Sequence, residues 1–185
     1  MSRRGISLEE ISEDYPIILV DTCALIGEID GEGYNMKRNS ANFFREYVDN
    51  GKGIYITPSV FKEYSNGGYS LHRKRLLDAI ESNSRILQLD GGEEIWYNLL
   101  FNSFLKIRDK FRLGETDYDF LISGAVLSEA RKKPIALISN DIGILRAWKY
   151  VLMVECLSPE EFGFLTRIGD ETFKRVKPPK NYTKI

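Results

Sequence analysis

Short apolar runs alternate along the chain with stretches in which apolar residues recur at helical spacing. This alternation predicts strands that alternate with helices. The two strongest runs open the predicted strands 17–21 and 135–138, and such runs are typical of strands buried on both faces. Weaker strands are predicted at 53–57, 85–89 and 150–155. The order of elements predicts an α/β protein built from βαβ units, with a parallel sheet and helices on both faces.

Helices are predicted where the apolar residues follow a helical period. In chain order, the predicted ranges are 8–12, 41–50, 58–66, 70–82, 92–112, 116–132, 142–149 and a short last helix at 158–162. Thr57 followed by Pro58 is typical of a helix start. Threonine caps the first turn, and proline is tolerated in that turn because its missing backbone N–H would have no partner within the helix. In the long helix, the apolar positions at helical spacing are Ile95, Leu99, Leu100, Phe104, Leu105 and Ile107.

Residues 1–165 are expected to form a single domain, because the chain shows neither an internal repeat nor a linker. The segment 27–39 is rich in Gly, Asp, Glu and Asn and is predicted to be a loop. The segment 166–185 is rich in lysine and contains paired prolines, and it is predicted to be a basic C-terminal tail without a fixed fold.

Composition narrows the class of protein. The formal net charge of −1 over 185 residues argues against a general nucleic-acid coat protein, which would be strongly basic. Two cysteines form no disulfide framework, and no apolar run approaches the ~20 residues that a membrane helix needs. We therefore expect a cytoplasmic protein with reduced thiols and no membrane contact.

Four carboxylates occupy informative places. Asp21 and Asp141 follow strands, Glu63 lies in the helix after the second strand, and Asp119 lies in the helix before the strand 135–138. Because ligands of an open parallel sheet bind beyond the carboxyl ends of its strands, these acids can meet at one edge. Each also has a local explanation. Asp21 can be a turn residue, Glu63 an exposed helical glutamate, Asp119 the acid of a capping box and Asp141 a helix N-cap.

Carboxylates that share a cleft repel one another, and a divalent cation removes that repulsion. Mg²⁺ and Mn²⁺ prefer oxygen ligands, and such ions activate water and stabilise the leaving oxygen of a phosphodiester. The lone His72 lies in a basic stretch and is read as part of a solvated helix face. The chemistry that fits an acidic site without histidine is metal-assisted phosphodiester hydrolysis.

At four places in order, the chain resembles the PIN domain family. The matching segments are Val20-Asp21-Thr22 with Leu25-Ile26, Val60-Phe61-Lys62-Glu63, Asp119-Phe120-Leu121-Ile122 with Ala125, and Leu137-Ile138-Ser139-Asn140-Asp141. The resemblance covers the chain from about Ile17 to Phe162. It implies a parallel sheet of about five strands within a three-layer α/β/α sandwich. It also implies an endoribonuclease that cleaves single-stranded RNA with one or two Mg²⁺ or Mn²⁺ ions.

The resemblance assigns roles to individual residues. It gives the catalytic quartet as Asp21, Glu63, Asp119 and Asp141, the metal ligands as Asp21, Asp119, Asp141 and Asp117, and supporting roles to Thr22, Ser139 and Asn140. The third acid is open, because Asp117 and Asp119 would point about 200° apart on a regular helix. We prefer Asp119, since Leu121, Ile122 and Ala125 then form the core stripe.

The basic residues Arg73, Lys74 and Arg75 are candidate phosphate contacts, although a charged exterior is the favoured explanation for any one of them. Single-stranded RNA is the expected partner. A toxin with an antitoxin-like protein partner, an RNA-processing enzyme and a homodimer all stay open.

Two other classes compete with the nuclease. A PIN-like fold without catalysis would serve as an RNA- or protein-binding scaffold. A phosphatase of the haloacid-dehalogenase type also places an aspartate after its first strand, but it needs a second aspartate where this chain has Cys23.

Overall fold

The structure is a computed structural model, and it describes residues 5–26, 40–67, 71–155, 157–169 and 172–178. The predicted loop at 27–39 and the end of the predicted tail lie outside the described residues. The helices are α1 (Leu8–Asp14), α2 (Thr22–Ile26), α3 (Ser40–Asp49), α4 (Pro58–Asn66), α5 (Leu71–Ser82), α6 (Gly91–Ser103), α7 (Leu105–Phe111), α8 (Glu115–Arg131) and α9 (Ile142–Val154). The strands are β1 (Ile17–Val20), β2 (Ile54–Tyr55), β3 (Ile135–Ile138), β4 (Phe162–Gly169) and β5 (Thr172–Arg175).

The sheet has five strands in the order β2-β1-β3-β4-β5, which confirms an α/β protein. The first four strands are parallel, but β5 runs antiparallel to β4, so the predicted all-parallel sheet is in fact mixed. The reason lies in the connection. Gly169 ends β4 and Thr172 begins β5, whereas a parallel pair needs a crossover of about a dozen residues or more.

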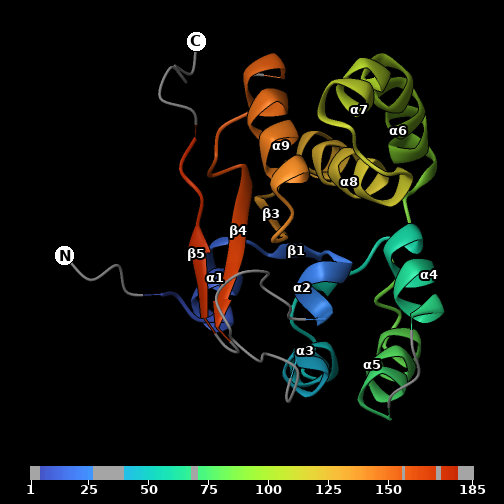
Figure 1. The fold of residues 1–185 in the computed structure, drawn as a ribbon, viewed down its shortest axis with the longest axis vertical. Helices are drawn as coiled ribbons and strands as arrows, with labels where there is room; N and C mark the ends of the chain where they lie inside the picture. The colour runs from blue at the N-terminus through green and yellow to red at the C-terminus, as the bar shows by residue number, and fades with distance from the viewer. Residues whose placement is uncertain (1–4, 27–39, 68–70, 156, 170–171, 179–185) are drawn as a thin grey trace.

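Helices cover both faces of the sheet. Figure 1 shows α8 and α9 together at one end of the molecule with α6 and α7 beside them. On one face of β4, Phe164 packs against Trp148 of α9, and Phe162 lies beside Gly124 of α8. On the opposite face, Gly163 meets the ring of Tyr15, which caps the C-terminus of α1.

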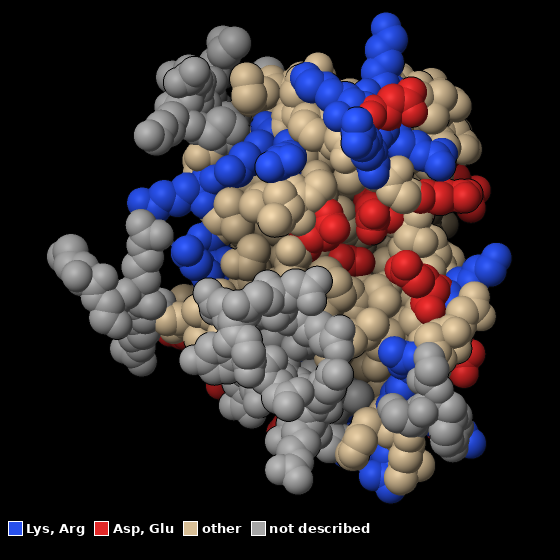
Figure 2. All heavy atoms as spheres, in the orientation of Figure 1, with Lys and Arg blue, Asp and Glu red and all other residues tan. Residues whose placement is uncertain are grey.

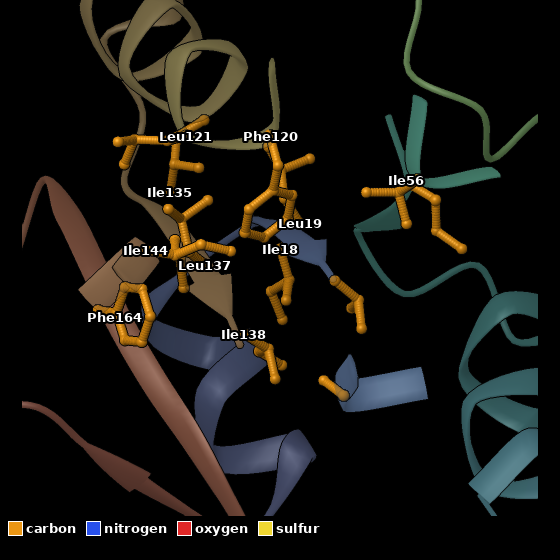
Figure 3. Close-up of a cluster of buried hydrophobic side chains, with 14 of the residues drawn as sticks. Ile18, Leu19, Ile56, Phe120, Leu121, Ile135, Leu137, Ile138, Ile144 and Phe164 are labelled. Atoms are coloured by element: carbon orange, nitrogen blue, oxygen red, sulfur yellow. The ribbon is translucent and has the colours of Figure 1, made fainter. Parts of the chain in front are cut away.

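The core forms where β1 and β3 pair beneath α8. All residues of both strands are buried, as the uninterrupted apolar runs predict. Figure 3 shows their side chains meeting Phe120 and Leu121 of α8, Ile144 of α9 and Phe164 of β4. Because these strands hold the centre of the core, the residues that follow them have fixed positions.

Two expectations for residues 150–162 differ from the structure. The predicted strand 150–155 continues α9 instead, because Val151 and Leu152 extend the buried side begun by Ala147 and Trp148. The predicted helix at 158–162 is a turn that leads into β4. There, pairing with β3 continues the chain as a strand.

The predicted tail from 166 onwards also differs, because its first part completes the sheet as the end of β4 and as β5. Arg167 is 1% exposed, and its guanidinium donates to the carbonyl of Ala24 and lies 5.1 Å from the centre of the Phe44 ring. A basic composition therefore misled the prediction, since one of these cations is buried in the domain.

In the middle of the chain, the predicted strand 85–89 forms only a single parallel bridge, between Ile86 and Ile56.

The predicted long helix 92–112 breaks at Phe104 into α6 and α7. Phe104 and Ile107 are buried, but two of the apolar positions in α6 face outward. Ile95 and Leu99 are 63% and 55% exposed. Polar contacts set the rotation: buried Glu93 pairs with Arg131 of α8 at 2.6 Å, and the Tyr97 hydroxyl donates to Asp119 of α8. No helix in the described ranges combines the length and hydrophobicity that crossing a bilayer requires.

Close backbone packing before β2 gives a test of the fold. The Gly53 carbonyl accepts a hydrogen bond from Ile18 at 2.7 Å, and a Cβ at Gly53 would lie 1.8 Å from the carbonyl oxygen of Pro16. We expect Gly53→Ala to lower the free energy of unfolding by about 1–3 kcal/mol, measured by urea denaturation. Gly91→Ala is the matched control, because its added methyl group meets no atom within 4 Å. Equal urea midpoints for the two variants would contradict the packing described.

Candidate active site

The register between β1 and β3 places the first candidate acid. Val20 pairs with Ile138, and the backbone N–H of Asp21 donates to the Ile138 carbonyl at 3.0 Å. Asp21 therefore lies beside Ser139, at the carboxyl ends of both strands. The neighbours of β1 are β2 on one side and β3 on the other, so this edge is the switch point where open sheets bind ligands.

Donors surround the Asp21 carboxylate, which is only 2% exposed. Oδ1 accepts from the backbone N–H of Thr22 at 2.7 Å. Oδ2 accepts from the Ser139 hydroxyl at 2.7 Å and from the Cys23 thiol at 2.8 Å. Burial raises the pKa of Asp21, and these hydrogen bonds oppose the rise. Because every one of these neighbours donates, the arrangement suits an ionised carboxylate held in one orientation.

Cys23 is a site residue that the sequence interpretation did not identify. Its sulfur donates to Asp21 and accepts from the backbone N–H of Asn140 at 3.2 Å. Burial raises the pKa of the Cys23 thiol, so the thiol stays protonated and remains a donor. Its place in the first turn of α2, two residues after Asp21, is the signal that could have identified it.

Ser139 connects the second candidate acid to the first. The backbone N–H of Asp141 donates to the Ser139 hydroxyl at 3.0 Å, and that hydroxyl donates to Asp21. Asp141 is exposed, and its Oδ1 accepts from the N–H of Ile144 at 2.8 Å, so it also caps α9 as the local explanation proposed. One Asp141 oxygen therefore serves the helix.

Glu63 joins this edge through Thr22. The Thr22 hydroxyl donates to Glu63 Oε2 at 2.6 Å, which links α2 to α4. Thr57 caps α4 as predicted, accepting from the N–H of Val60 at 3.4 Å. Glu63 is exposed, so it lies at the rim of the site.

Asp117 is the third acid of this group. It lies in the first turn of α8, where its carboxylate accepts from the N–H of Gly114 at 3.2 Å. Burial, followed by the negative charges of Asp21 and Asp141, raises the pKa of Asp117 from 3.8 to about 6, and the charge of Glu63 adds to the rise. Asp117 therefore lies within electrostatic reach of the other three carboxylates.

Asp119, the preferred third acid, lies elsewhere. One of its oxygens accepts from the Ser59 hydroxyl and the other from the Tyr97 hydroxyl, and it lines a separate cavity. The choice of Asp119 rested on a core stripe, but α8 is buried on nearly all sides from 120 to 128. An apolar stripe therefore could not show which side of α8 faces the acidic group. Because Asp117 and Asp119 point about 200° apart on the helix, only one of them can face that group.

Of the remaining candidates, Asn140 and Arg73 have structural partners. The Asn140 side chain exchanges hydrogen bonds with the backbone of Arg167 at 3.2 and 2.8 Å, which extends the contact between β3 and β4. The Arg73 guanidinium lies over the ring of Tyr64 in α4, 4.7 Å from its centre. Lys74 and Arg75 are exposed on α5.

Acidic side chains gather at the centre of one face of the molecule, with most lysines and arginines toward its edges (Figure 2). No three His, Cys, Asp or Glu side chains in the described ranges come close enough to form a complete metal cage. The donor set is nevertheless one that suits Mg²⁺, which is typically held by one or two carboxylates together with water and substrate phosphate.

Comparison with known proteins identifies no family. No protein-family model matches the chain, and neither a curated protein nor a solved structure matches it. The resemblance to PIN domains rests on the residues themselves.

The raised pKa of Asp117 predicts a pH dependence of stability. The folded-state pKa of about 6 exceeds the ordinary 3.8, so the folded protein binds a proton on Asp117 more tightly than the unfolded chain does. The stability that this protonation contributes is fully present below about pH 4 and is lost as the pH rises through 6. We expect Asp117→Asn in chelator to raise the Tm at pH 7.5 by about 2–4 °C, because solvent screening limits the gain to roughly 1 kcal/mol. The difference from wild type should shrink toward pH 4.

Asp119→Asn is the matched control, since it makes the same chemical change two residues along the same helix but outside the acidic group. It should give no gain at pH 7.5 in the same thermal melts. An identical response from both variants would contradict the placement of Asp117.

Proposed function

We propose that this protein is a Mg²⁺- or Mn²⁺-dependent endoribonuclease that cleaves single-stranded RNA, with the three-layer arrangement of a PIN-like domain. The observation that carries the proposal is the Ser139 hydroxyl, which donates to Asp21 and accepts from the backbone N–H of Asp141. It joins the acids that follow two neighbouring strands at one edge of the sheet, and Asp117 lies close enough to sense both charges. Repulsion among buried or half-buried carboxylates is typical of sites that bind a cation or perform acid–base chemistry.

Asp21, Asp117 and Asp141 are the proposed ligands, and Glu63 is proposed to act from the rim through water. When bound, the ion would lower the pKa of a coordinated water and neutralise charge that develops on the phosphate. The predicted quartet is thus retained in the proposal with Asp117 in place of Asp119.

The neighbouring residues prepare this site for its role. Ser139, Cys23 and the Thr22 N–H hold the Asp21 carboxylate so that its orientation needs no adjustment when a ligand arrives. The Thr22 hydroxyl aligns Glu63 in the same way. Positioning residues of this kind are as necessary to a metal site as the ligands themselves.

Two helix N-termini add positive potential. Asp117 lies in the first turn of α8, and Asp141 is the N-cap of α9, so both helices begin at the acidic group. Their dipoles stabilise negative charge at this position and favour the approach of a phosphate. The site therefore combines carboxylates for a cation with two helix dipoles that favour an anion.

Removal of the most buried ligand tests the proposal. We expect Asp21→Asn to reduce manganese-dependent cleavage of an end-labelled single-stranded RNA by about 100-fold or more, because a lost ligand weakens transition-state stabilisation by several kcal/mol. Asp78→Asn, on the exposed surface of α5, should cleave at the wild-type rate. Equal rates for all three proteins would refute the assignment.

A binding scaffold without catalysis is the second candidate. The observation that favours it is the lack of a complete cage of three acids within the described ranges. Calorimetric titration with Mn²⁺ separates the two candidates. Saturable binding that Asp21→Asn removes supports the nuclease, and a flat titration at millimolar Mn²⁺ supports the scaffold.

A further inference from the structure

We propose that the cavity beside Asp119 binds a guanine base of the RNA that enters the acidic site. This inference rests on the proposed function, since it names a substrate feature for the same reaction. The cavity lies between the start of α4, α6, α8 and residues 87–89, and its volume is about 600 Å³. Small-molecule sites typically measure about 300–1,000 Å³, so a nucleoside fits within it.

Asp119 gives the cavity its chemistry. The Ser59 and Tyr97 hydroxyls donate to different oxygens of its carboxylate, which fixes the plane of the group. An ionised carboxylate has about four acceptor positions, so each oxygen keeps one for a ligand. Asp119 lines the cavity, and we assign these two remaining acceptor positions to the ligand.

Guanine is the RNA base that matches two parallel acceptors. Its N1–H and its N2 amino group are adjacent donors on the Watson–Crick edge, the edge that proteins read in single-stranded RNA. Adenine and cytosine place a donor beside an acceptor there, and uracil places one donor between two acceptors. A paired, charge-assisted contact is both stronger and more selective than a single hydrogen bond.

The walls suit the flat faces and the remaining polar edge of a base. Leu87, Leu89 and the half-buried ring of Tyr97 line the cavity with apolar surface. Gln88 and Asn98 are exposed lining residues whose amides can donate to the O6 atom of guanine. The lining thus combines apolar surface with a few polar groups, as ligand sites commonly do.

A groove lies between this cavity and the acidic site, and Ser59, which donates to Asp119, lines that groove. Ser59 lines a neighbouring groove of about 490 Å³ together with Lys62, Glu63 and Thr116. Glu63 accepts from Thr22 next to Asp21, so this groove leads to the acidic group. On α8 itself, Asp117 and Asp119 differ by about 3 Å along the axis and lie on opposite sides of the helix. A strand with its phosphate at the acidic group can follow the groove, past Lys62, and place a nearby base in the cavity.

Nucleotide binding without metal tests the inference separately from catalysis. In chelator, we expect the protein to bind guanosine 5′-monophosphate about tenfold more tightly than inosine 5′-monophosphate, which lacks the N2 amino group. Adenosine 5′-monophosphate should bind at least about tenfold more weakly than the guanosine nucleotide. Titration calorimetry measures all three dissociation constants. Equal affinities would overturn the inference.

Variants test which residue gives the preference for the guanosine nucleotide. Asp119→Asn should weaken guanosine 5′-monophosphate by about tenfold and remove the preference over the inosine nucleotide. Tyr97→Phe keeps the ring but removes one of the two hydroxyls that fix the Asp119 plane, so it should lessen that preference, and it serves as the second test if Asp119→Asn fails to fold. Asp78→Asn is the matched control and should bind as wild type. If the preference persists in folded Asp119→Asn, Asp119 only bridges helices, and the inference is refuted.

The two proposals can fail independently. Asp21→Asn should lose cleavage and keep the nucleotide preference. Nucleotide discrimination in a wild-type protein that never cleaves RNA would refute the nuclease and leave the base site standing. Cleavage without discrimination among the three nucleotides would refute the base site alone.

Discussion

Parallel pairing of β1 with β3 is the interaction on which the remaining structure depends. Both strands are buried throughout, and their pairing places Asp21 beside Ser139. A slip of one residue would turn every side chain of a strand to the opposite face, so the hydrophobic core itself determines this register. The same contacts that exclude water from the core therefore bring Asp21 and Ser139 to its edge, where Thr22, Cys23 and Ser139 orient the Asp21 carboxylate.

The acidic group works against stability, and its surroundings limit the cost. Asp21 is buried, but it receives hydrogen bonds from Thr22, Cys23 and Ser139. The N-termini of α8 and α9 add favourable potential for negative charge. The repulsion that remains is expressed in the raised pKa of Asp117. Proteins commonly keep such unfavourable electrostatics where function requires it.

Helix α8 separates two chemical environments. Asp117 faces the acids that follow β1 and β3, whereas Asp119 faces hydroxyl groups of α4 and α6. Because α8 is buried along most of its length, its position and rotation are set by the whole core. The proposed chemistry on one side and the proposed base recognition on the other are thus held at a constant separation.

Local pattern alone determined the buried strands β1 and β3, the cap at Thr57 and the acids that follow the strands. Each of these depends on residues adjacent in the chain, where apolar runs and capping groups act directly. Tertiary contacts decided the rest. Glu93 and Tyr97 oriented α6 by pairing with α8, and the partner strand β3 made a strand of the segment after Phe162. The choice between Asp117 and Asp119 depended on the residues of other elements that each side chain faces. An apolar stripe on a helix that is buried on nearly all sides does not predict those neighbours.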